Sequence, residues 1–295
     1  MPFARRLSPI VLAGLLCASH VSAAAAQASS PGWIYTTTFS YDSGDGSHHG
    51  SLAVRFQATD RASRMQYVHM EGSSMANASS IEGAYVLQNR ADSSTMMVIP
   101  SQQLVTIMAG PMLSLSAPLK PQVSQHVATE NVEDLGPGER ILDHATQHHR
   151  VTRRGTMEIR LGDQSCTRPI DDVTEVWIAP DVDLTPAMQS ALGQTGAAIS
   201  DLLKQDPPSK LPKGATLRAV TRSSRPDAQG GSRTITTTVE ITELSQASLD
   251  SSLFVVPDGY RRIDMRQALA QAPAGMRDQA TKFALGMMCG TATKP

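Results

Sequence analysis

Apolar and polar residues alternate with a period of two through the first half of the chain, a pattern typical of half-buried β-strands. One face of a first strand carries Trp33, Tyr35, Thr37, Phe39 and Tyr41. A turn over 42–46 leads to a return strand with Leu52, Val54 and Phe56, because Asp and Gly tolerate the backbone of a tight hairpin. The short spacings that follow predict an antiparallel meander with further strands over 65–70, 84–88, 95–99 and 104–108.

The alternation weakens over 110–140, where prolines and a Gly-Pro-Gly sequence interrupt it. This segment is therefore predicted to be a long connection. Period-two patterns resume afterwards and predict strands over 148–153, 157–161, 173–179, 216–223 and 233–244.

Helical signals are few. Thr185 and Pro186 form a good start for one helix, and Asp264 with Gln267 resembles the capping box of a second. Apolar residues at helical spacing over 276–287 predict a third. The expected fold class is α+β, mainly β: a curved antiparallel sheet, or incomplete β-barrel, covered on one face by a few helices. A single domain over 27–295 would carry a C-terminal helical segment over about 264–289.

The first 26 residues have the three parts of a secretory signal peptide. Arg5 and Arg6 precede an apolar run over 7–17, and small residues up to Ala26 offer a cleavage site near Ala23 to Ala26. The apolar run is shorter than the ~20 residues that span a bilayer as a helix. We therefore expect a periplasmic or secreted protein that does not span the membrane.

Composition narrows the classes of ligand. The net charge is −1 and aromatic residues make up 4% of the chain. Nucleic-acid binding is not expected, because it needs a basic stripe. The chain has no recognisable catalytic, phosphate-binding or dinucleotide-binding motif, so we expect a non-enzymatic protein without a cofactor.

Two cysteines, Cys166 and Cys289, remain after loss of the signal peptide. An even pair in an oxidising compartment is a candidate disulfide, and two separate free thiols are the alternative.

Methionine is the most unusual feature of the first half of the chain. Three interpretations are open, of which ordinary core filling is the simplest. A flexible apolar cavity would be lined by Met65, Tyr67, Met96 and Met108, because Met adapts to irregular ligands. A soft-metal site for Cu(I) would instead use Met65, His69 and Met70.

Two segments resemble a known family: Leu249 to Tyr260, which ends in Phe-x-x-Pro-x-Gly-Tyr, and Thr174 to Ala179, which contains Glu-x-Trp. Both are similar to exported bacterial proteins of unknown function whose fold resembles that of the periplasmic lipoprotein carriers (LolA-like and LolB-like). A Gly-x-x-Cys element often found in that family is absent from 143–148. The signature residues are interpreted as structural: Trp177, Phe254, Pro257, Gly259 and Tyr260. Leu253 to Val256 reads as a short apolar strand that Pro257 ends.

The resemblance implies a periplasmic binding protein for a hydrophobic or amphipathic ligand, such as a lipid or lipoprotein, or for another envelope protein. Three alternatives remain: a copper-binding protein, a periplasmic enzyme whose catalytic residues the sequence does not identify, and a structural envelope protein that has no ligand.

Overall fold

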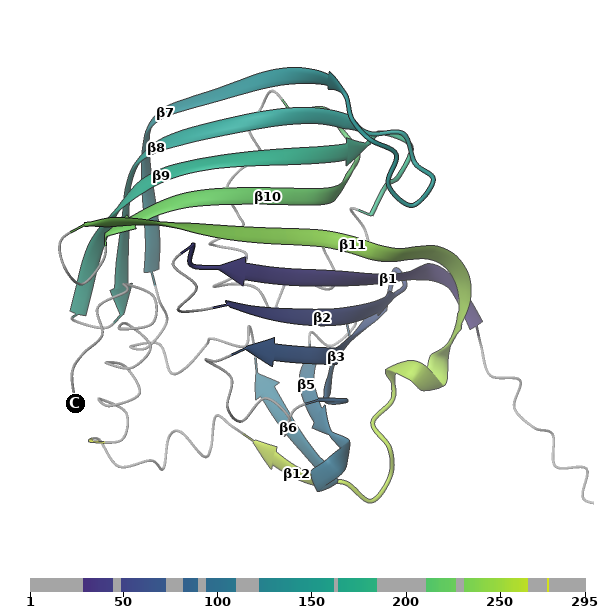
Figure 1. Ribbon diagram of the computed structural model, residues 1–295. Helices are drawn as coiled ribbons and strands as arrows, with labels where there is room; N and C mark the ends of the chain where they lie inside the picture. Colours follow the sequence, from purple (N-terminus) through teal and green to yellow (C-terminus); the bar gives the residue numbers. More distant parts are fainter. Residues whose placement is uncertain are drawn as a thin grey trace, which may run out of the picture.

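The computed structural model describes residues 29–44, 49–72, 82–89, 94–109, 122–161, 164–184, 211–226, 231–264 and 275. They form one open sheet of 12 strands (Figure 1). The strands are β1 Ser29–Asp42, β2 His49–Ala58, β3 Ala62–Gly72, β4 Tyr85–Asn89, β5 Ser94–Ile99, β6 Leu104–Ala109, β7 Gln122–Pro137, β8 Gln147–Leu161, β9 Gln164–Ala179, β10 Ala215–Pro226, β11 Ser232–Asp250 and β12 Arg261–Asp264. Two short 3₁₀ helices, η2 Pro100–Gln102 and η4 Ser251–Phe254, accompany them.

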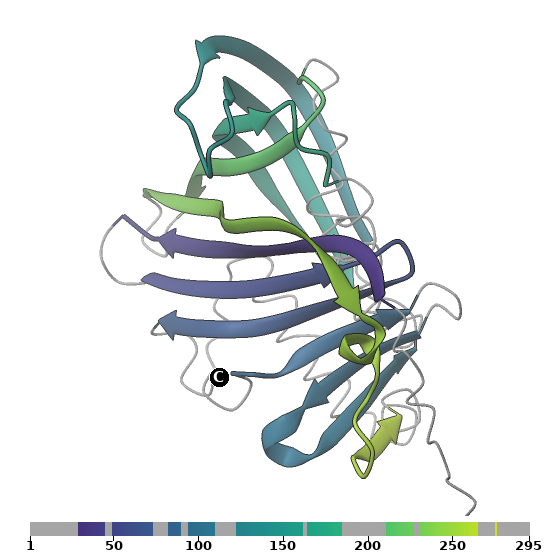
Figure 2. The ribbon, with the colours of Figure 1, turned by 90° about the vertical axis from the view of Figure 1, so that its right-hand side faces the viewer.

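The sheet consists of two antiparallel meanders, β1 to β6 and β7 to β11, joined where β1 pairs with β11. Strand β12 is the exception, because it pairs in parallel with β6 at one edge. The order across the sheet is β12-β6-β5-β4-β3-β2-β1-β11-β10-β9-β8-β7. The sheet is strongly curved, and its long strands β8 and β9 bend along their length (Figures 1 and 2).

Strand register assigns each side chain to one of two faces. We call the side that carries Tyr35, Phe56 and Ile241 the inner face, and the opposite side the outer face. The larger cluster of buried apolar residues lies on the inner face, with members on β1, β2, β10 and β11. A second, smaller cluster lies on the outer face of β4 to β6, where Val256 and Tyr260 pack against Leu87, Val98 and Val105.

The expected α+β class is wrong. In the part of the chain that the structure describes, no α-helix covers either face, and the architecture is all β. The predicted helices after Thr185, after Asp264 and over 276–287 lie outside the described residues, as do the predicted signal peptide and almost all of the predicted C-terminal helical segment. Within the described ranges, no helix is long and apolar enough to cross a membrane.

The segment expected to be a connection contains β7, a 16-residue edge strand. Its polar residues and glycine obscure the alternation, because an edge strand is solvated along one side. Two register shifts against β8, at Val127/Thr129 and Asp134/Gly136, break the period further. At the second shift Gly136 adopts a positive φ of 87° and its N–H donates to Asp134 Oδ1 at 2.8 Å.

The predicted short strand over Leu253 to Val256 is also wrong. The chain forms η4 there instead, because the Asp250 side chain accepts a hydrogen bond from the N–H of Ser252 at 2.8 Å and caps a turn. The chain then reaches β12, which sequence periodicity did not predict.

Candidate functional site

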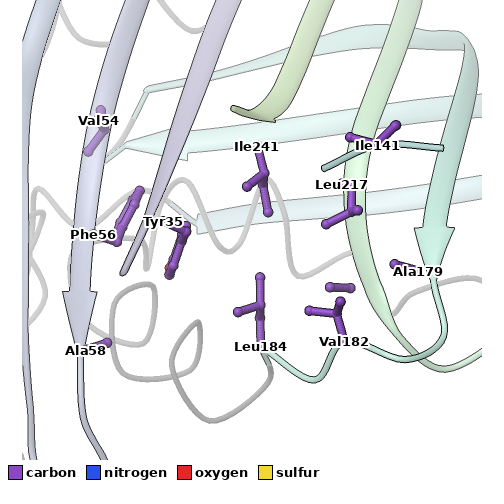
Figure 3. Close-up of a cluster of buried hydrophobic side chains, with 11 residues drawn as sticks. Tyr35, Val54, Phe56, Ala58, Ile141, Ala179, Val182, Leu184, Leu217 and Ile241 are labelled. Atoms are coloured by element: carbon purple, nitrogen blue, oxygen red, sulfur yellow. The ribbon is translucent and has the colours of Figure 1, made fainter. Parts of the chain in front are cut away.

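The inner face carries a compact aromatic and aliphatic cluster (Figure 3). Tyr35 and Phe56, which are cross-strand partners on β1 and β2, stack with ring centroids 4.7 Å apart and planes 10° apart. Ile241 from β11 and Leu217 from β10 extend the cluster sideways, and Val182 and Leu184 from the segment after β9 pack against it. Residues far apart in the sequence therefore build one apolar surface.

Two tyrosines show how apolar this surface is. Burial raises the pKa of the Tyr35 hydroxyl and, to a smaller degree, that of Tyr67. Desolvation disfavours the charged phenolate, so both side chains stay neutral across the physiological pH range. Neither offers a charge to a bound ligand.

A pocket of about 570 Å³ lies beside this cluster. It is bounded by the first residues of β1, the end of β2 with the turn that follows, and residues 246–248 of β11. Its side chains are mixed: Pro31, Trp33 and Ala58 are apolar, whereas Asp60 and Gln246 are polar. Trp33 connects the two features, because it lines the pocket and also packs against the inner-face cluster.

Gly32 makes the base of this pocket possible. A Cβ atom at this position would lie 2.5 Å from the carbonyl oxygen of Ala58 and 2.7 Å from Cδ1 of Leu249. Both distances are far below van der Waals contact, so only glycine lets β1 approach the end of β2 and the buried Leu249 this closely.

The structure separates the residues predicted to line a cavity. Met65 and Tyr67 on β3 pack against the inner-face cluster. Met96 belongs to the outer-face cluster, so it lines a different surface. Met108 lies on β6, and the structure does not describe its side chain.

The candidate metal ligands do not converge either. Register pairs Met65 with Phe56 and Met70 with Leu52, both on the inner face. His69 pairs with Ala53 on the outer face, 3.8 Å from a Glu71 carboxylate oxygen. A bulge at this point of β3 causes the split. Among the described residues, no group of three or more His, Cys, Asp and Glu side chains could hold a metal ion.

The signature residues occupy two places. Trp177 lies on β9, where its ring stacks on His148 with centroids 4.3 Å apart and the Arg218 guanidinium lies 5.6 Å from its centroid. Tyr260 packs on the outer-face cluster, and its neighbourhood contains Pro257 and the positive-φ Gly259. Phe254 ends η4.

An ion-pair ladder surrounds Trp177 on the outer face. Glu175 lies 3.5 Å from Arg150, 3.4 Å from Arg222 and 3.2 Å from Nε2 of His148. Burial alone would raise the pKa of Glu175, but the Arg150 charge, the His148 hydrogen bond and Arg222 together lower it. Because each charge is paired with a group of opposite charge, we interpret the ladder as structural rather than as a binding site.

Cys166 is disulfide-bonded. Its expected partner, Cys289, lies outside the described residues, so the pairing stays a prediction.

Sequence reasoning missed the pocket residues and a set of inward-facing arginines on β9 to β11. Trp33 was recognised as a strand residue, but no local pattern shows that β11 runs beside it. Of these arginines, Arg168 could have been found by extending the period-two alternation of β9 from Val176 back to Arg168.

No protein-family model matches the chain, and no curated protein matches it. Among solved structures, it is similar to an uncharacterized conserved protein from Thermus thermophilus, with a TM-score of 0.35 and 12% sequence identity. That similarity covers 81% of this chain and 92% of the other. At this TM-score the likeness carries no argument about fold or function.

Proposed function

We propose that the protein is a non-enzymatic binding protein of the cell envelope that holds the apolar part of a hydrophobic or amphipathic ligand. The observation that carries the proposal is the pocket beside Trp33 and its continuity with the inner-face aromatic cluster. Its volume of about 570 Å³ lies within the range of small-molecule sites, ~300–1,000 Å³. An apolar wall with a few polar groups at its border fits an amphipathic ligand.

The driving force would be burial of apolar area, worth ~25 cal/mol per Å² before the costs of association are subtracted. The polar groups of Asp60 and Gln246 would face the polar part of the ligand.

The two tryptophans allow a direct test, because both pack against the inner-face cluster but only Trp33 also lines the pocket. The probe is 9,10-dibromostearate, whose bromine atoms quench tryptophan fluorescence on contact. Trp177→Phe leaves Trp33 as the single reporter, and Trp33→Phe leaves Trp177. Circular dichroism would verify that both variants fold.

We expect saturable quenching in Trp177→Phe and none in Trp33→Phe. Native mass spectrometry of protein purified from a bacterial periplasm should then show a bound mass that extracts into organic solvent. Equal quenching in both variants, or none in either, would refute binding in the pocket. A persistently empty protein would favour the structural alternative, in which the buried inner-face cluster is simply a packed core.

A further inference from the structure

A group of charged side chains lies on the inner face, far from the pocket. It comprises Arg168 on β9, Arg225 on β10 and Arg233 on β11, with Asp172 on β9. Register pairs Arg225 with Arg233, and Asp172 with the inner-face residues Arg153 and Ser223. We call these three arginines the arginine cluster. Gln246, opposite Trp33, is thirteen residues from Arg233, or about 43 Å along the curved strand at ~3.3 Å per residue.

The hydrogen bonding of the arginine cluster is poor. Nε and Nη2 of Arg168 both point at the Met157 sulfur, at 3.3 and 3.2 Å, and a thioether is a weak acceptor. Arg225 donates to the carbonyl oxygen of Pro169 at 3.3 Å. Nε of Arg233 is buried without a hydrogen-bond partner. Buried donors of this kind cost free energy until something satisfies them.

The charges are also unbalanced. Asp172 is the nearest carboxylate, at 3.7 Å from Arg225 Nη2, and its Oδ1 makes no hydrogen bond. The neighbouring Arg153 does not change the balance, because Glu130 already pairs with it at 2.8 Å. Arg168 and Arg225 therefore share one carboxylate, and Arg233 lies opposite Arg225 in the register. Burial lowers the pKa of Arg168, and the charge of Arg225 lowers it further.

The outer-face ladder is better matched. There Arg150 lies 3.3 Å from Glu133 and 3.5 Å from Glu175, and Arg222 lies 3.4 Å from Glu175. Polarity also changes in steps along the inner face. Beyond the apolar Leu217 and Ile241 comes a hydroxyl pair, Thr174 and Thr221, with oxygens 3.0 Å apart. The arginine cluster follows further along the same strands.

We propose that the arginine cluster is a binding site for an oxyanion, a phosphate or carboxylate group, carried by a ligand or present as a free ion. Such a group would supply the negative charge and the hydrogen-bond acceptors that the arginine cluster lacks. Guanidinium groups bind planar or tetrahedral oxyanions through paired N–H donors. The site stands independently of the Trp33 pocket, because it rests on different residues at the other end of β11.

Isothermal titration calorimetry on the full mature chain at low ionic strength tests this proposal with three probes: inorganic phosphate, a short-chain phosphatidic acid below its micellar concentration, and the matching neutral diacylglycerol. Arg168→Met and Arg225→Gln should each weaken the binding of anionic probes at least tenfold. The control is Arg222→Gln, which removes the same charge from the outer face of β10 and should change the affinity less than twofold.

Thermal unfolding without ligand gives a second readout. Removal of a half-buried, poorly matched cation should leave the melting temperature of Arg168→Met unchanged or higher, which a merely structural arginine would not do. If Arg168→Met does not fold, Arg225→Gln and Arg233→Gln provide the same comparison.

Binding of inorganic phosphate that is lost in these variants supports a site for the free ion. Binding of phosphatidic acid alone, lost in the same variants, supports a lipid headgroup. Absence of anion binding, or equal losses in Arg222→Gln, overturns the site. Quenching of Trp33 by 9,10-dibromostearate, with no binding of phosphate or phosphatidic acid, would leave the pocket proposal standing and refute this one. Phosphate binding without Trp33 quenching would do the reverse.

Discussion

Replacement of Gly32 by alanine tests how the pocket is built. The added methyl carbon would lie 2.5 Å from the Ala58 carbonyl oxygen and 2.7 Å from Leu249 Cδ1. Since ordinary contacts begin at 3.4 Å, β2 and the Leu249 side chain would have to retreat by roughly 0.9 and 0.7 Å. Overpacking of this kind costs about 1–3 kcal/mol. We expect a loss of unfolding free energy in that range.

Urea unfolding followed by tryptophan fluorescence would measure the effect, with Ser30→Ala on the same strand as a control expected to stay within ~0.5 kcal/mol. A double variant, Gly32→Ala with Leu249→Ala, removes one of the two clashes. It should be destabilised by less than the sum of the two single variants. The same Gly32→Ala variant should also weaken the quenching of Trp33, because it displaces the end of β2, where Ala58 lines the pocket.

If Gly32→Ala leaves the free energy of unfolding unchanged, the reasoning is refuted, because the close approach of β1 to β2 and β11 would then not depend on glycine. Strict additivity in the double variant would show that Leu249 is not the group displaced.

Three further predictions concern the inner face and its border. Leu217→Ala, at a fully buried position, should cost about 2–5 kcal/mol in urea unfolding, whereas Val68→Ala, at 45% exposure, should cost less than ~0.5 kcal/mol. The raised pKa of Tyr35 implies stability that is present below the unfolded-state pKa near ~10 and declines as the pH rises above it, so Tyr35→Phe should decline less steeply in alkaline unfolding curves. The hydrogen bond from His144 lowers the pKa of Asp181; its contribution is present above ~3.9 and disappears as the pH falls through the lowered value, and His144→Gln should raise that pKa in carboxyl NMR titrations.

Strict alternation made the first meander predictable. Residues over 33–41 and 52–56 have one apolar face each, and the strands form there with the expected partners. The prediction lost accuracy where the period breaks. The bulge that leaves Val68 without a partner on β2 moves His69 to the outer face, and no local signal marks a bulge.

The features that the sequence did not predict depend on contacts between segments that are distant in the sequence. Met96 resembles Met65 in sequence, but its place in the outer-face cluster depends on Val256 and Tyr260, more than 150 residues away. Strand β7 was missed because its partner β8 and its solvated edge, rather than its own apolar content, make it a strand. Likewise, neither Arg225 nor Arg233 is unusual alone, and only their register shows that they lie opposite each other.

The pairing of β1 with β11 and of β6 with β12 has a consequence for how the chain folds. Each of these contacts joins residues separated by most of the described chain. The conformational entropy of closing such a long loop is therefore lost before the strand pairing can stabilise the chain. The meander β1 to β6 emerges first during synthesis, yet both of its outer edges stay unpaired until residues 232–264 exist. Exposed strand edges template the pairing of one chain with another. Productive folding therefore depends on keeping nascent chains apart until the last two strands arrive, and truncation before Arg261 should leave a product that aggregates rather than a smaller stable sheet.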